Sequence, residues 1–255
     1  MGKGHQDKIA VITGAAAGIG QAFAQRLAQD GAHIVIADVQ SADETMALVE
    51  RTGRRALYCR CDVSSPEAVA ALAVQVEHAF GRCDILVNNA GTFYLRPFEE
   101  ITFAEWRRVM SINLDSMFLT ASAFAPGMKR RGWGRIVNMS SSTFGMVTPG
   151  YVHYIATKGA IIGLTRALAS DLGPCGITVN AIAPTLTRTP GAMKRGLRLG
   201  ETDMVQAFAA TAAMQAIPHA MVPDDLVGTV SFLTSDDAAF ITGQTFYVNG
   251  GLVRV

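Results

Sequence analysis

The chain has 255 residues, of which 49% are hydrophobic and 17% charged, and its formal net charge at pH 7 is +1. This composition supplies a large apolar core, and it offers no basic face or long charge run to meet nucleic acid. Residues 1–6 are polar, so we expect no secretory signal.

The four cysteines are Cys59, Cys61, Cys83 and Cys175. Their spacing matches neither a zinc site nor a disulfide framework, so we expect no metal. Cys59 and Cys61 alternate along a predicted strand and should share one face. Reduced thiols indicate a cytoplasmic protein.

The N-terminal segment has the order of a dinucleotide-binding unit. A β-branched run over residues 8–13 precedes a glycine-rich turn, a helical apolar pattern then ends at Gly31, and residues 33–38 form a second buried-strand pattern. We expect the glycines of residues 13–20 to let the backbone approach a pyrophosphate at the N-terminus of the helix.

Asp38 ends the second strand, where an acid accepts hydrogen bonds from both hydroxyls of an adenosine ribose. The glycine spacing, Gly14-x-x-x-Gly18-x-Gly20, departs from the generic Gly-x-Gly-x-x-Gly, so the assignment depends on the flanking strands and the acid. A helix N-cap or a surface acid at a strand end is the other interpretation of Asp38.

Asp38 also bears on which cofactor is used. A 2′-phosphate would lie against this carboxylate, and like charges at contact distance are costly. Ala17 supplies no compensating cation within the turn, although Arg60 or the neighbouring Arg54 and Arg55 could approach it. We therefore predict NAD as the cofactor.

The alternation of strands and helices continues through the middle of the chain. Residues 56–61 and 83–87 are predicted strands, which end at Asp62-Val63 and at the segment 88–91. Residues 103–131 are predicted as one long helix with Asn113 in its interior. Since asparagine is a poor helix former, Asn113 bends the helix, holds water beside a site, or is an ordinary side chain in a groove.

Residues 135–166 are predicted to contain the catalytic groups. A strand-like run ends in three serines, and Tyr154 and Lys158 follow on one face of a helix. A free tyrosine titrates near ~10 and a neighbouring ammonium favours the phenolate; lowering the pKa by about three units requires roughly 4 kcal/mol. In this prediction Tyr154 transfers a proton, Lys158 lowers the pKa of Tyr154, and the Ser141 hydroxyl donates a hydrogen bond to a carbonyl oxygen. These three roles suit the interconversion of an alcohol and a ketone.

Other interpretations of this stretch exist. The pattern Tyr-x-x-x-Lys also arises by chance on amphipathic helices, and Tyr151 has only Ile155 as its partner four residues on. Residues 136–157 contain no Lys, Arg, Asp or Glu, which is long enough for a membrane span, but Asn138, Pro149, Gly150 and the serines interrupt the run. We expect the floor of an active site here and no membrane contact.

The C-terminal part completes the alternation. The helix continues to Gly173, residues 177–183 form a strand that ends at Pro184, and two further helical stretches precede a last strand over residues 244–248. No repeat, linker or low-complexity segment occurs, so residues 1–255 are predicted as one domain. The predicted fold class is α/β, a doubly wound parallel sheet with helices on both faces.

These motifs together resemble the short-chain dehydrogenase/reductase family over essentially the whole chain. They are Thr13-Gly-x-x-x-Gly-Ile-Gly20, Asp62, Asn88-Asn-Ala-Gly91, Asn113, Ser141, Tyr154-x-x-x-Lys158 and Ile241-Thr-Gly-Gln244. The resemblance implies a three-layer Rossmann-type sheet of about seven strands. It also implies an assembly that is usually a tetramer or dimer, and we expect a homotetramer.

The resemblance further implies roles for individual residues. In the family the tyrosine at the position of Tyr154 is the acid/base. The lysine at the position of Lys158 lowers the pKa of this tyrosine and binds the nicotinamide ribose, and the serine at the position of Ser141 orients the substrate oxygen. Asn113 holds a water in a proton relay that starts at the lysine. The implied cofactor site comprises Gly14, Ala17, Gly18, Ile19, Gly20, Asp38, Val39, Asp62, Val63, Asn89, Ala90, Gly91, Tyr154, Lys158, Pro184, Thr187 and Thr189.

Two positions depart from the family pattern. Thr185 follows Pro184, where the family usually has glycine. In the family this turn meets the nicotinamide carboxamide, so the departure affects the assignment of Thr187 and Thr189 to the cofactor site. Asn249 stands where Asp is common, which bears on assembly.

Residues 189–218 lie where the family forms its substrate lid. The segment includes Met193, Lys194, Arg195, Leu197, Arg198, Leu199, Met204, Phe208 and Met214. The apolar members form either an adaptable pocket wall or the core-facing sides of two short helices. Phe93, Tyr94, Phe144 and Met146 are further pocket candidates, and His153 is assigned to packing or to the rim.

We predict a neutral ketone or secondary alcohol, aryl or cyclic, as the small-molecule substrate. Residues 215–218 and 252–254 resemble those of aryl-alkyl alcohol dehydrogenases, such as 1-phenylethanol dehydrogenases, and of pyridoxal-type dehydrogenases. An NADPH-dependent 3-oxoacyl-carrier-protein reductase is the alternative, since residues 129–131, all basic, could meet an acidic carrier. A non-catalytic nucleotide-binding relative is the third hypothesis. The presence of all four residues of the family's catalytic tetrad, Asn113, Ser141, Tyr154 and Lys158, weighs against it.

Overall fold

The computed structural model describes residues 4–198 and 204–254. Within them, seven strands form one sheet in the order β3-β2-β1-β4-β5-β6-β7, and every neighbouring pair is parallel. The strands are β1 (Ile9–Thr13), β2 (His33–Asp38), β3 (Ala56–Arg60), β4 (Ile85–Asn88), β5 (Gly134–Met139), β6 (Ile177–Pro184) and β7 (Thr245–Val248). The predicted fold class, a doubly wound α/β sheet, is confirmed.

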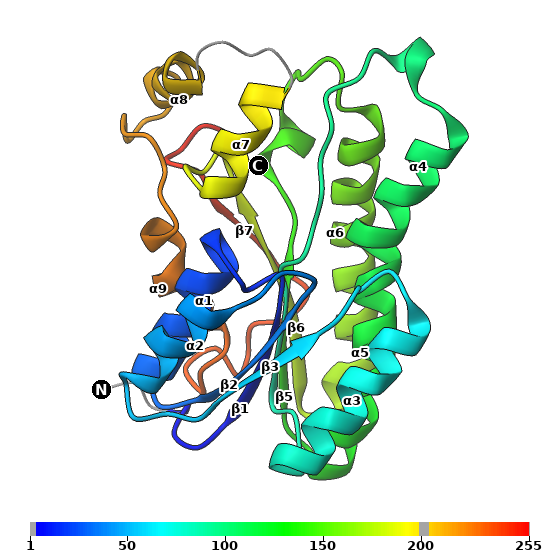
Figure 1. Ribbon diagram of the computed structural model, residues 1–255, viewed down its shortest axis with the longest axis vertical. Coiled ribbons are helices and arrows are strands. Elements are labelled where there is room, and N and C mark those ends of the chain that lie inside the picture. Colours follow the sequence, from blue (N-terminus) through cyan, green and yellow to red (C-terminus); the bar gives the residue numbers. More distant parts are fainter. Residues whose placement is uncertain (1–3, 199–203, 255) are drawn as a thin grey trace.

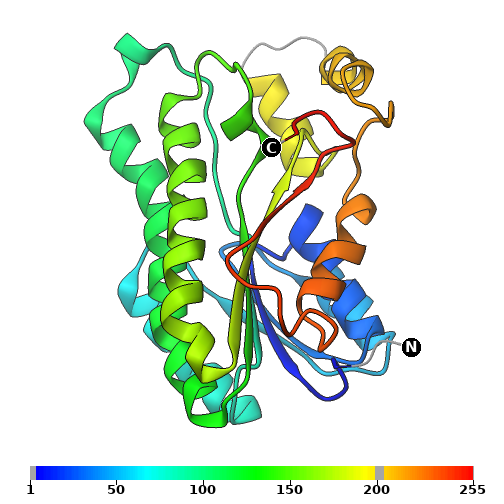
Figure 2. The same cartoon turned by 180° about the vertical axis from the view of Figure 1, so that it is seen from behind.

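Helices cover both faces of this sheet (Figure 1, Figure 2). Helices α1, α2 and α9 lie on one face and α3 to α6 on the other, while α7 and α8 lie beyond the carboxyl ends of the strands. The helices are α1 (Gly18–Gln29), α2 (Asp43–Glu50), α3 (Pro66–Phe80), α4 (Phe103–Met110), α5 (Ser116–Arg131), α6 (Val152–Leu172), α7 (Pro190–Arg198), α8 (Met204–Ala213) and α9 (Asp224–Leu233).

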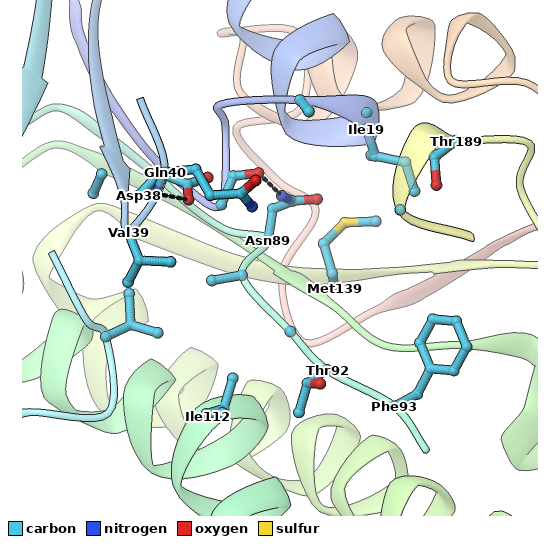
Figure 3. Close-up of a pocket in the computed structure, with 18 of the residues that line it drawn as sticks. Ile19, Asp38, Val39, Gln40, Asn89, Thr92, Phe93, Ile112, Met139 and Thr189 are labelled. Atoms are coloured by element: carbon cyan, nitrogen blue, oxygen red, sulfur yellow. Dashed lines mark hydrogen bonds between the residues drawn. The ribbon is translucent and has the colours of Figure 1, made fainter. Parts of the chain in front are cut away.

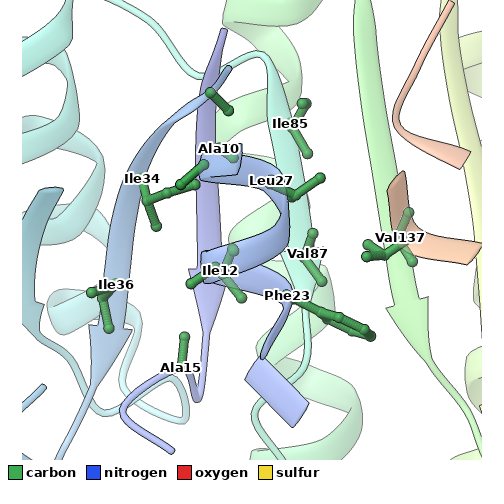
Figure 4. Packing of buried hydrophobic residues seen from close by; sticks show 14 of the residues in the cluster. Ala10, Ile12, Ala15, Phe23, Leu27, Ile34, Ile36, Ile85, Val87 and Val137 are labelled. Atoms are coloured by element: carbon green, nitrogen blue, oxygen red, sulfur yellow. The ribbon is translucent and has the colours of Figure 1, made fainter. Parts of the chain in front are cut away.

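Successive side chains of a strand point to opposite faces, so each strand contributes to two separate cores. From β1, Ala10 and Ile12 pack with Phe23 and Leu27 of α1 (Figure 4). The alternate residues Ile9 and Val11 join the core under α3 and α5, which includes Leu72 and Met128. Strands buried on both sides explain the continuous apolar runs of the sequence.

The stretch 103–131, predicted as one helix, is helical throughout, but its interior changes from an α-helix to a π-helical turn. A π-helical turn, Ser111–Asp115, separates α4 from α5 and contains Asn113. Asn113 is completely buried and its side chain bonds groups outside the helix, which accounts for the extra residue in this turn.

Among the described residues that follow Pro184 there are three α-helices, where two helical stretches were expected. Pro190 begins α7, and α9 begins directly after Pro223. Proline lacks an amide donor, so it favours a helix start and separates these segments into short helices.

Chain order reverses between β1 and β4, which are neighbours although β2 and β3 intervene in the sequence. In open parallel sheets, ligands bind at the carboxyl ends of the strands beside such a point. No helix among the described residues is long and apolar enough to span a bilayer.

Candidate active site

A cavity of about 480 Å³ lies along the carboxyl ends of the central strands (Figure 3). It brings together residues from eight separate stretches of the chain. The predicted site residues that line it are Gly14, Ala17, Gly18, Ile19, Asp38, Val39, Asp62, Val63, Asn89, Ala90, Gly91, Tyr154, Lys158, Pro184 and Thr189. Gly20, Asn113, Ser141 and Thr187 are not among its lining residues.

The glycine turn after β1 leaves space that a side chain would fill. Gly14 has a φ of +65°, and a Cβ there would lie 2.7 Å from the Cα of Ala90. At Gly20 a Cβ would lie 2.4 Å from the Gly14 carbonyl oxygen, so this glycine permits α1 to pack against the turn without itself reaching the cavity. These close approaches explain why glycine is required at both positions.

The N-terminus of α1 opens toward the cavity. Ala17 is its N-cap residue and makes no side-chain capping bond. The amides of the first turn therefore keep their capacity to donate, and the helix dipole favours an anion at this end. The turn fits a pyrophosphate group.

Asn89 fastens the strand end after β4 to this turn. Its side-chain amide donates to the carbonyl oxygens of Thr13 and Gly14, at 3.0 and 2.9 Å. The Thr13 hydroxyl in return accepts from the amides of Asn89 and Ala90, both at 3.0 Å. The two strand ends therefore form one rigid wall of the cavity.

Asp38 lies at the cavity wall and does not cap a helix (Figure 3). One carboxylate oxygen accepts from the amide of Ala16 at 3.0 Å, and the other accepts from the amide of Gln40 at 3.0 Å. Each carboxylate oxygen can accept a second bond, so Asp38 still has acceptors for two hydroxyl groups.

Asp62 lines the same end of the cavity. Its carboxylate accepts from the hydroxyl of Ser64 at 2.7 Å and from the amide of Ser64 at 3.0 Å. These two bonds, with a smaller contribution from the charge of Arg108, hold the pKa of Asp62 below its usual value. Asp62 is therefore an ionised acceptor at neutral pH.

Tyr154 and Lys158 come from the first two turns of α6. The Lys158 ammonium nitrogen lies 5.3 Å from the centroid of the Tyr154 ring and donates to the carbonyl oxygen of Met139 at 2.7 Å. Lys158 is 5% exposed, and burial lowers its pKa to about 7. A lysine that titrates near neutral pH suits proton transfer.

Ser141 lies at the end of β5, next to the cavity. Its oxygen accepts from the amide of Thr143 at 3.2 Å and from the hydroxyl of Thr143 at 2.9 Å. Since the oxygen accepts both bonds, the Ser141 hydrogen is left to donate elsewhere. The neighbouring Ser140 has a structural contact, because its hydroxyl donates to the Lys158 carbonyl at 2.9 Å.

Asn113 connects the π-helical turn to two other elements. Its side-chain oxygen accepts from the amide of Thr92 at 2.7 Å. Its side-chain nitrogen donates to the Thr92 carbonyl at 2.8 Å and to the Thr157 hydroxyl at 3.2 Å. Asn113 therefore fixes the loop after β4 against α6.

Of the two threonines predicted to contact the cofactor after Pro184, Thr189 lines the cavity and Thr187 does not. The oxygen of Thr189 accepts from the amide of Ala192 at 3.1 Å and so caps α7. Thr187 is buried and its hydroxyl donates to the Thr185 carbonyl at 2.9 Å, outside the cavity.

The predicted lid is only partly described. Leu199 and the side chains of Arg195, Leu197 and Arg198 lie outside the described residues. Phe208 and Met204 are buried in a small cluster with Ala192, whereas Met214 is exposed. For Phe208 and Met204 the core-facing interpretation applies.

The pocket candidates separate into two sets. Phe93 lines the cavity, and its ring meets the ring of Tyr154 with centroids 5.8 Å apart. Tyr94 lies 6.3 Å from the ring of the buried His153, which therefore packs and does not lie at a rim. Phe144 instead lines a second cavity between α6 and β7, because it packs over Gly159 on the far side of α6.

Sequence reasoning missed several lining residues. They are Ala37, Gln40, Cys61, Thr92, Arg108, Ile112, Met139, Ser140, Gly191 and Ala192. Several flank predicted residues directly in sequence, so proximity to Asp38, Asp62, Gly91 or Asn113 was the available signal. Arg108 and Met139 carried no such signal in the sequence. Arg108 is an exposed arginine on a helix, and Met139 contacts Lys158 through its backbone carbonyl.

Among residues 4–198 and 204–254, no three His, Cys, Asp or Glu side chains gather in a way that could hold a metal ion. The doubly wound sheet, the glycine turn and the acid after β2 define instead a nucleotide-binding α/β protein whose cavity also contains a tyrosine–lysine pair.

Comparison with known proteins identifies the family. A family model described as enoyl-(acyl carrier protein) reductase matches residues 14–253. The short-chain reductase protein NovJ of Streptomyces niveus is 38% identical, covering 96% of this chain and 94% of that protein. A hydroxy(phenyl)methylsuccinyl-CoA dehydrogenase subunit of Thauera aromatica is 38% identical, covering 97% of both. A 3-oxoacyl-(acyl-carrier-protein) reductase of Synechocystis is 35% identical, covering 96% of this chain and 97% of that one.

Among solved structures, a putative short-chain alcohol dehydrogenase of Sinorhizobium meliloti superposes with a TM-score of 0.90 at 37% identity, covering 97% of this chain and 96% of that one. The chain belongs to the short-chain dehydrogenase/reductase family of oxidoreductases.

Proposed function

We propose that this protein is an NAD(H)-dependent oxidoreductase that interconverts a neutral secondary alcohol and a ketone, with Tyr154 as acid/base. The proposal rests chiefly on one observation: the Lys158 ammonium lies 5.3 Å from the Tyr154 ring centroid, in the same cavity as Asp38. A cavity that joins a proton-transfer pair to a site for a nucleotide suits dehydrogenation.

The preference for NAD is supported by the charges around Asp38. Its carboxylate disfavours a 2′-phosphate, and two of the arginines that could compensate are engaged elsewhere. Arg54 forms an ion pair with Asp7 at 2.8 Å. Arg55 donates to the Ala79 carbonyl at 3.1 Å and lies over the ring of Phe80.

Each group of the protein then has a separate role in the proposed reaction. The first turn of α1 and the glycine turn bind the pyrophosphate, and Asp38 accepts from the ribose hydroxyls. A bound nicotinamide supplies the acceptor, or in reverse the donor, of two electrons. Ser141 donates its hydroxyl hydrogen to the substrate oxygen, and Tyr154 takes or returns the proton of that oxygen. Lys158 stabilises the phenolate form of Tyr154.

The substrate is proposed to be compact and aryl or cyclic. Phe93 and Tyr151 flank the Tyr154 ring at centroid distances of 5.8 and 6.1 Å, which gives the reacting oxygen an aromatic surrounding. The Thauera relative is named for a secondary alcohol beside a phenyl group. The test is NADH fluorescence while aryl and alicyclic secondary alcohols are offered with NAD. Turnover of compact aryl alcohols is expected. No turnover across the panel, with NAD still bound, would contradict this substrate class and direct the search to acyl thioesters, sugars or steroids.

Replacing Tyr154 by phenylalanine separates an enzyme from a nucleotide-binding relative. Since Tyr154→Phe removes only the hydroxyl that moves the proton, we expect kcat to fall by at least about a hundredfold. Affinity for NADH, measured by fluorescence titration, should stay nearly unchanged. Weakened NADH binding would indicate a structural tyrosine, and unchanged turnover would contradict the acid/base role.

A 3-oxoacyl-carrier-protein reductase is the second candidate, favoured by the Synechocystis relative. The basic residues 129–131 end α5, next to the start of β5 and therefore at the end of the sheet opposite the cavity within one chain. Arg131 is engaged with Asp84 and the Cys83 carbonyl. Faster turnover with NADPH and an acyl thioester than with NAD and an alcohol would favour this candidate.

We further propose that residues 1–255 act as one domain, that the protein works in the cytoplasm and that it assembles as a homotetramer. All four cysteines are unpaired, as suits a reducing compartment. Phe118, 59% exposed, adjoins a cavity between α5 and α6, which is an apolar surface suited to a second copy. Light scattering after gel filtration measures the assembly, and a monomer would contradict it.

A further inference from the structure

The catalytic helix α6 begins without a conventional cap. Its N-cap residue, Tyr151, makes no side-chain capping bond, and the first backbone bond of the helix runs from the Ile155 amide to the Tyr151 carbonyl at 2.8 Å. The amide of Tyr154 therefore lacks a carbonyl partner within the helix. This amide belongs to the residue proposed to move the proton.

The imidazole of His153 supplies the missing acceptor. The Tyr154 amide donates to Nδ1 of His153 at 3.0 Å, and His153 is 1% exposed, so the ring is shielded from solvent. Because Nδ1 accepts a hydrogen bond, the ring is neutral and its proton is on Nε2.

The groups that face His153 favour the neutral ring. Burial is the main cause that lowers the pKa of His153; the charge of Arg96 lowers it further, and Glu105 opposes both. Glu105 is itself paired with Arg96 at 3.0 Å and bonded to Thr102 in the capping box of α4. Tyr94, with its ring 6.3 Å away, is the remaining titratable neighbour on the loop after β4.

We propose that His153 is a positioning residue: as a neutral imidazole cap it fixes the first turn of α6 and so holds the Tyr154 ring in register with Lys158. This inference rests on the proposed acid/base function of Tyr154. Protonation of the ring removes the acceptor and adds a cation at a helix N-terminus, where positive charge is unfavourable. Proton transfer by Tyr154 therefore depends on His153 being uncharged.

Two variants of similar size test the proposal. His153→Leu replaces the imidazole by an apolar side chain that has no hydrogen-bond acceptor. His153→Asn places a carbonyl oxygen at the same number of bonds from the backbone as Nδ1. His78→Leu is the matched control, because His78 is exposed in the last turn of α3, far from the site.

The first readout is independent of turnover. Hydrogen–deuterium exchange of the intact protein, followed in a peptide that covers residues 151–158, should be faster in His153→Leu than in the wild type. It should return to the wild-type rate in His153→Asn. His78→Leu should match the wild type.

The second readout is the kinetics of alcohol oxidation. Misplacing a reacting group by about 1 Å costs up to about a hundredfold, so we expect kcat of His153→Leu to fall by about tenfold to a hundredfold, with NADH affinity unchanged. His153→Asn should recover most of this loss. It should also lack the additional decrease of kcat that we expect in the wild type below about pH 6.5, where the imidazole gains its proton, while keeping the decrease that comes from Lys158.

Several outcomes overturn the proposal. They are equal losses of kcat in both variants, a wild-type exchange rate in His153→Leu, or a lower Tm of His153→Leu without any change in kcat. Failure of the wild-type protein to oxidise any alcohol contradicts the proposed function instead, because the exchange measurement still tests the cap.

Discussion

Lys158 determines the pH response of the proposed proton transfer. It is buried, its ammonium group donates to the Met139 carbonyl, and burial lowers its pKa to about 7. A phenolate on Tyr154 would favour the charged lysine, so the two residues lose protons as a coupled pair. Lys158 therefore differs from an ordinary lysine, which would stay charged beside the tyrosine throughout the neutral pH range.

Alcohol oxidation should rise with pH through about 7, and ketone reduction should fall, because oxidation releases a proton that the pair must first give up. Lys158→Met keeps the chain length and removes the amine, so we expect kcat to fall by about a hundredfold and the inflection near neutral pH to disappear. Stopped-flow or steady-state rates between pH 5 and 9 measure both. An unchanged inflection in Lys158→Met would assign it to another group.

Asp38 is the residue that we propose determines the preference for NAD over NADP. Asp38→Asn removes the charge and keeps an oxygen that accepts from the Ala16 amide. We expect the ratio of kcat/KM for NADP over NAD to rise by about tenfold or more, because a repulsion of about 1.4 kcal/mol corresponds to that factor. Asp43→Asn, an exposed acid at the start of α2, is the control for a general loss of negative charge. An equal ratio in both variants would place the Asp38 carboxylate away from the 2′ position.

At the scale of elements, the π-helical turn between α4 and α5 links three parts of the site. Its Asn113 bonds the Thr92 backbone after β4 and the Thr157 hydroxyl on α6. Thr157 in turn donates to the Tyr154 carbonyl at 2.7 Å. The loop that contains Phe93 and the helix that contains Tyr154 are thus fixed by one side chain.

Asn113→Ala should destabilise the protein by about 2 kcal/mol or more, because the Thr92 amide and carbonyl both lose their partner in a part-buried site. We expect kcat to fall as well, since Phe93 and Tyr154 lose their common support. Urea denaturation and kcat measure the two effects. Ser111→Ala is the control, because Ser111 lies in the same turn, is only half-buried, and its hydroxyl donates within its own helix, to the Arg108 carbonyl. A stability loss with full kcat would limit Asn113 to folding.

At the scale of the whole molecule, His5 joins the N-terminal segment to the C-terminal helix. Its Nε2 lies 2.8 Å from the Thr234 hydroxyl, directly after α9, although 229 positions separate them. The side chain is 1% exposed, and burial is the main cause that lowers its pKa from 6.5. Of its charged neighbours, Asp30 and Asp236 raise the pKa while Arg26 and Lys8 lower it.

The free energy of unfolding should decrease as the pH falls below about 6.5. The unfolded chain then binds protons at His5 and at His33 and His153, whose pKa values burial also lowers, while the folded protein does not. Carboxylates with lowered pKa values add to this loss only near pH 4. His5→Gln should reduce the slope between pH 7 and 5 in urea titrations. A slope equal to that of the wild type would show that His5 does not contribute.

Local patterns in the sequence were sufficient to predict the α/β alternation, the parallel doubly wound sheet and the family. These follow from local patterns: continuous apolar runs, helical periodicity, glycines in a tight turn and Tyr-x-x-x-Lys on one helix face. The placement of Gly14, Asp38 and Lys158 around one cavity follows because parallel strands end at a common edge.

The contacts between distant elements became known only from the three-dimensional arrangement of the helices and strands. It placed Phe144 on the far side of α6, made the Met139 carbonyl the acceptor for Lys158, and engaged Arg54 and Arg55 away from Asp38. It also made a completely buried Asn113 the link between two elements and a buried His153 the acceptor for the Tyr154 amide. Such contacts depend on which helix packs beside which strand, and many use backbone groups, which every residue type has alike.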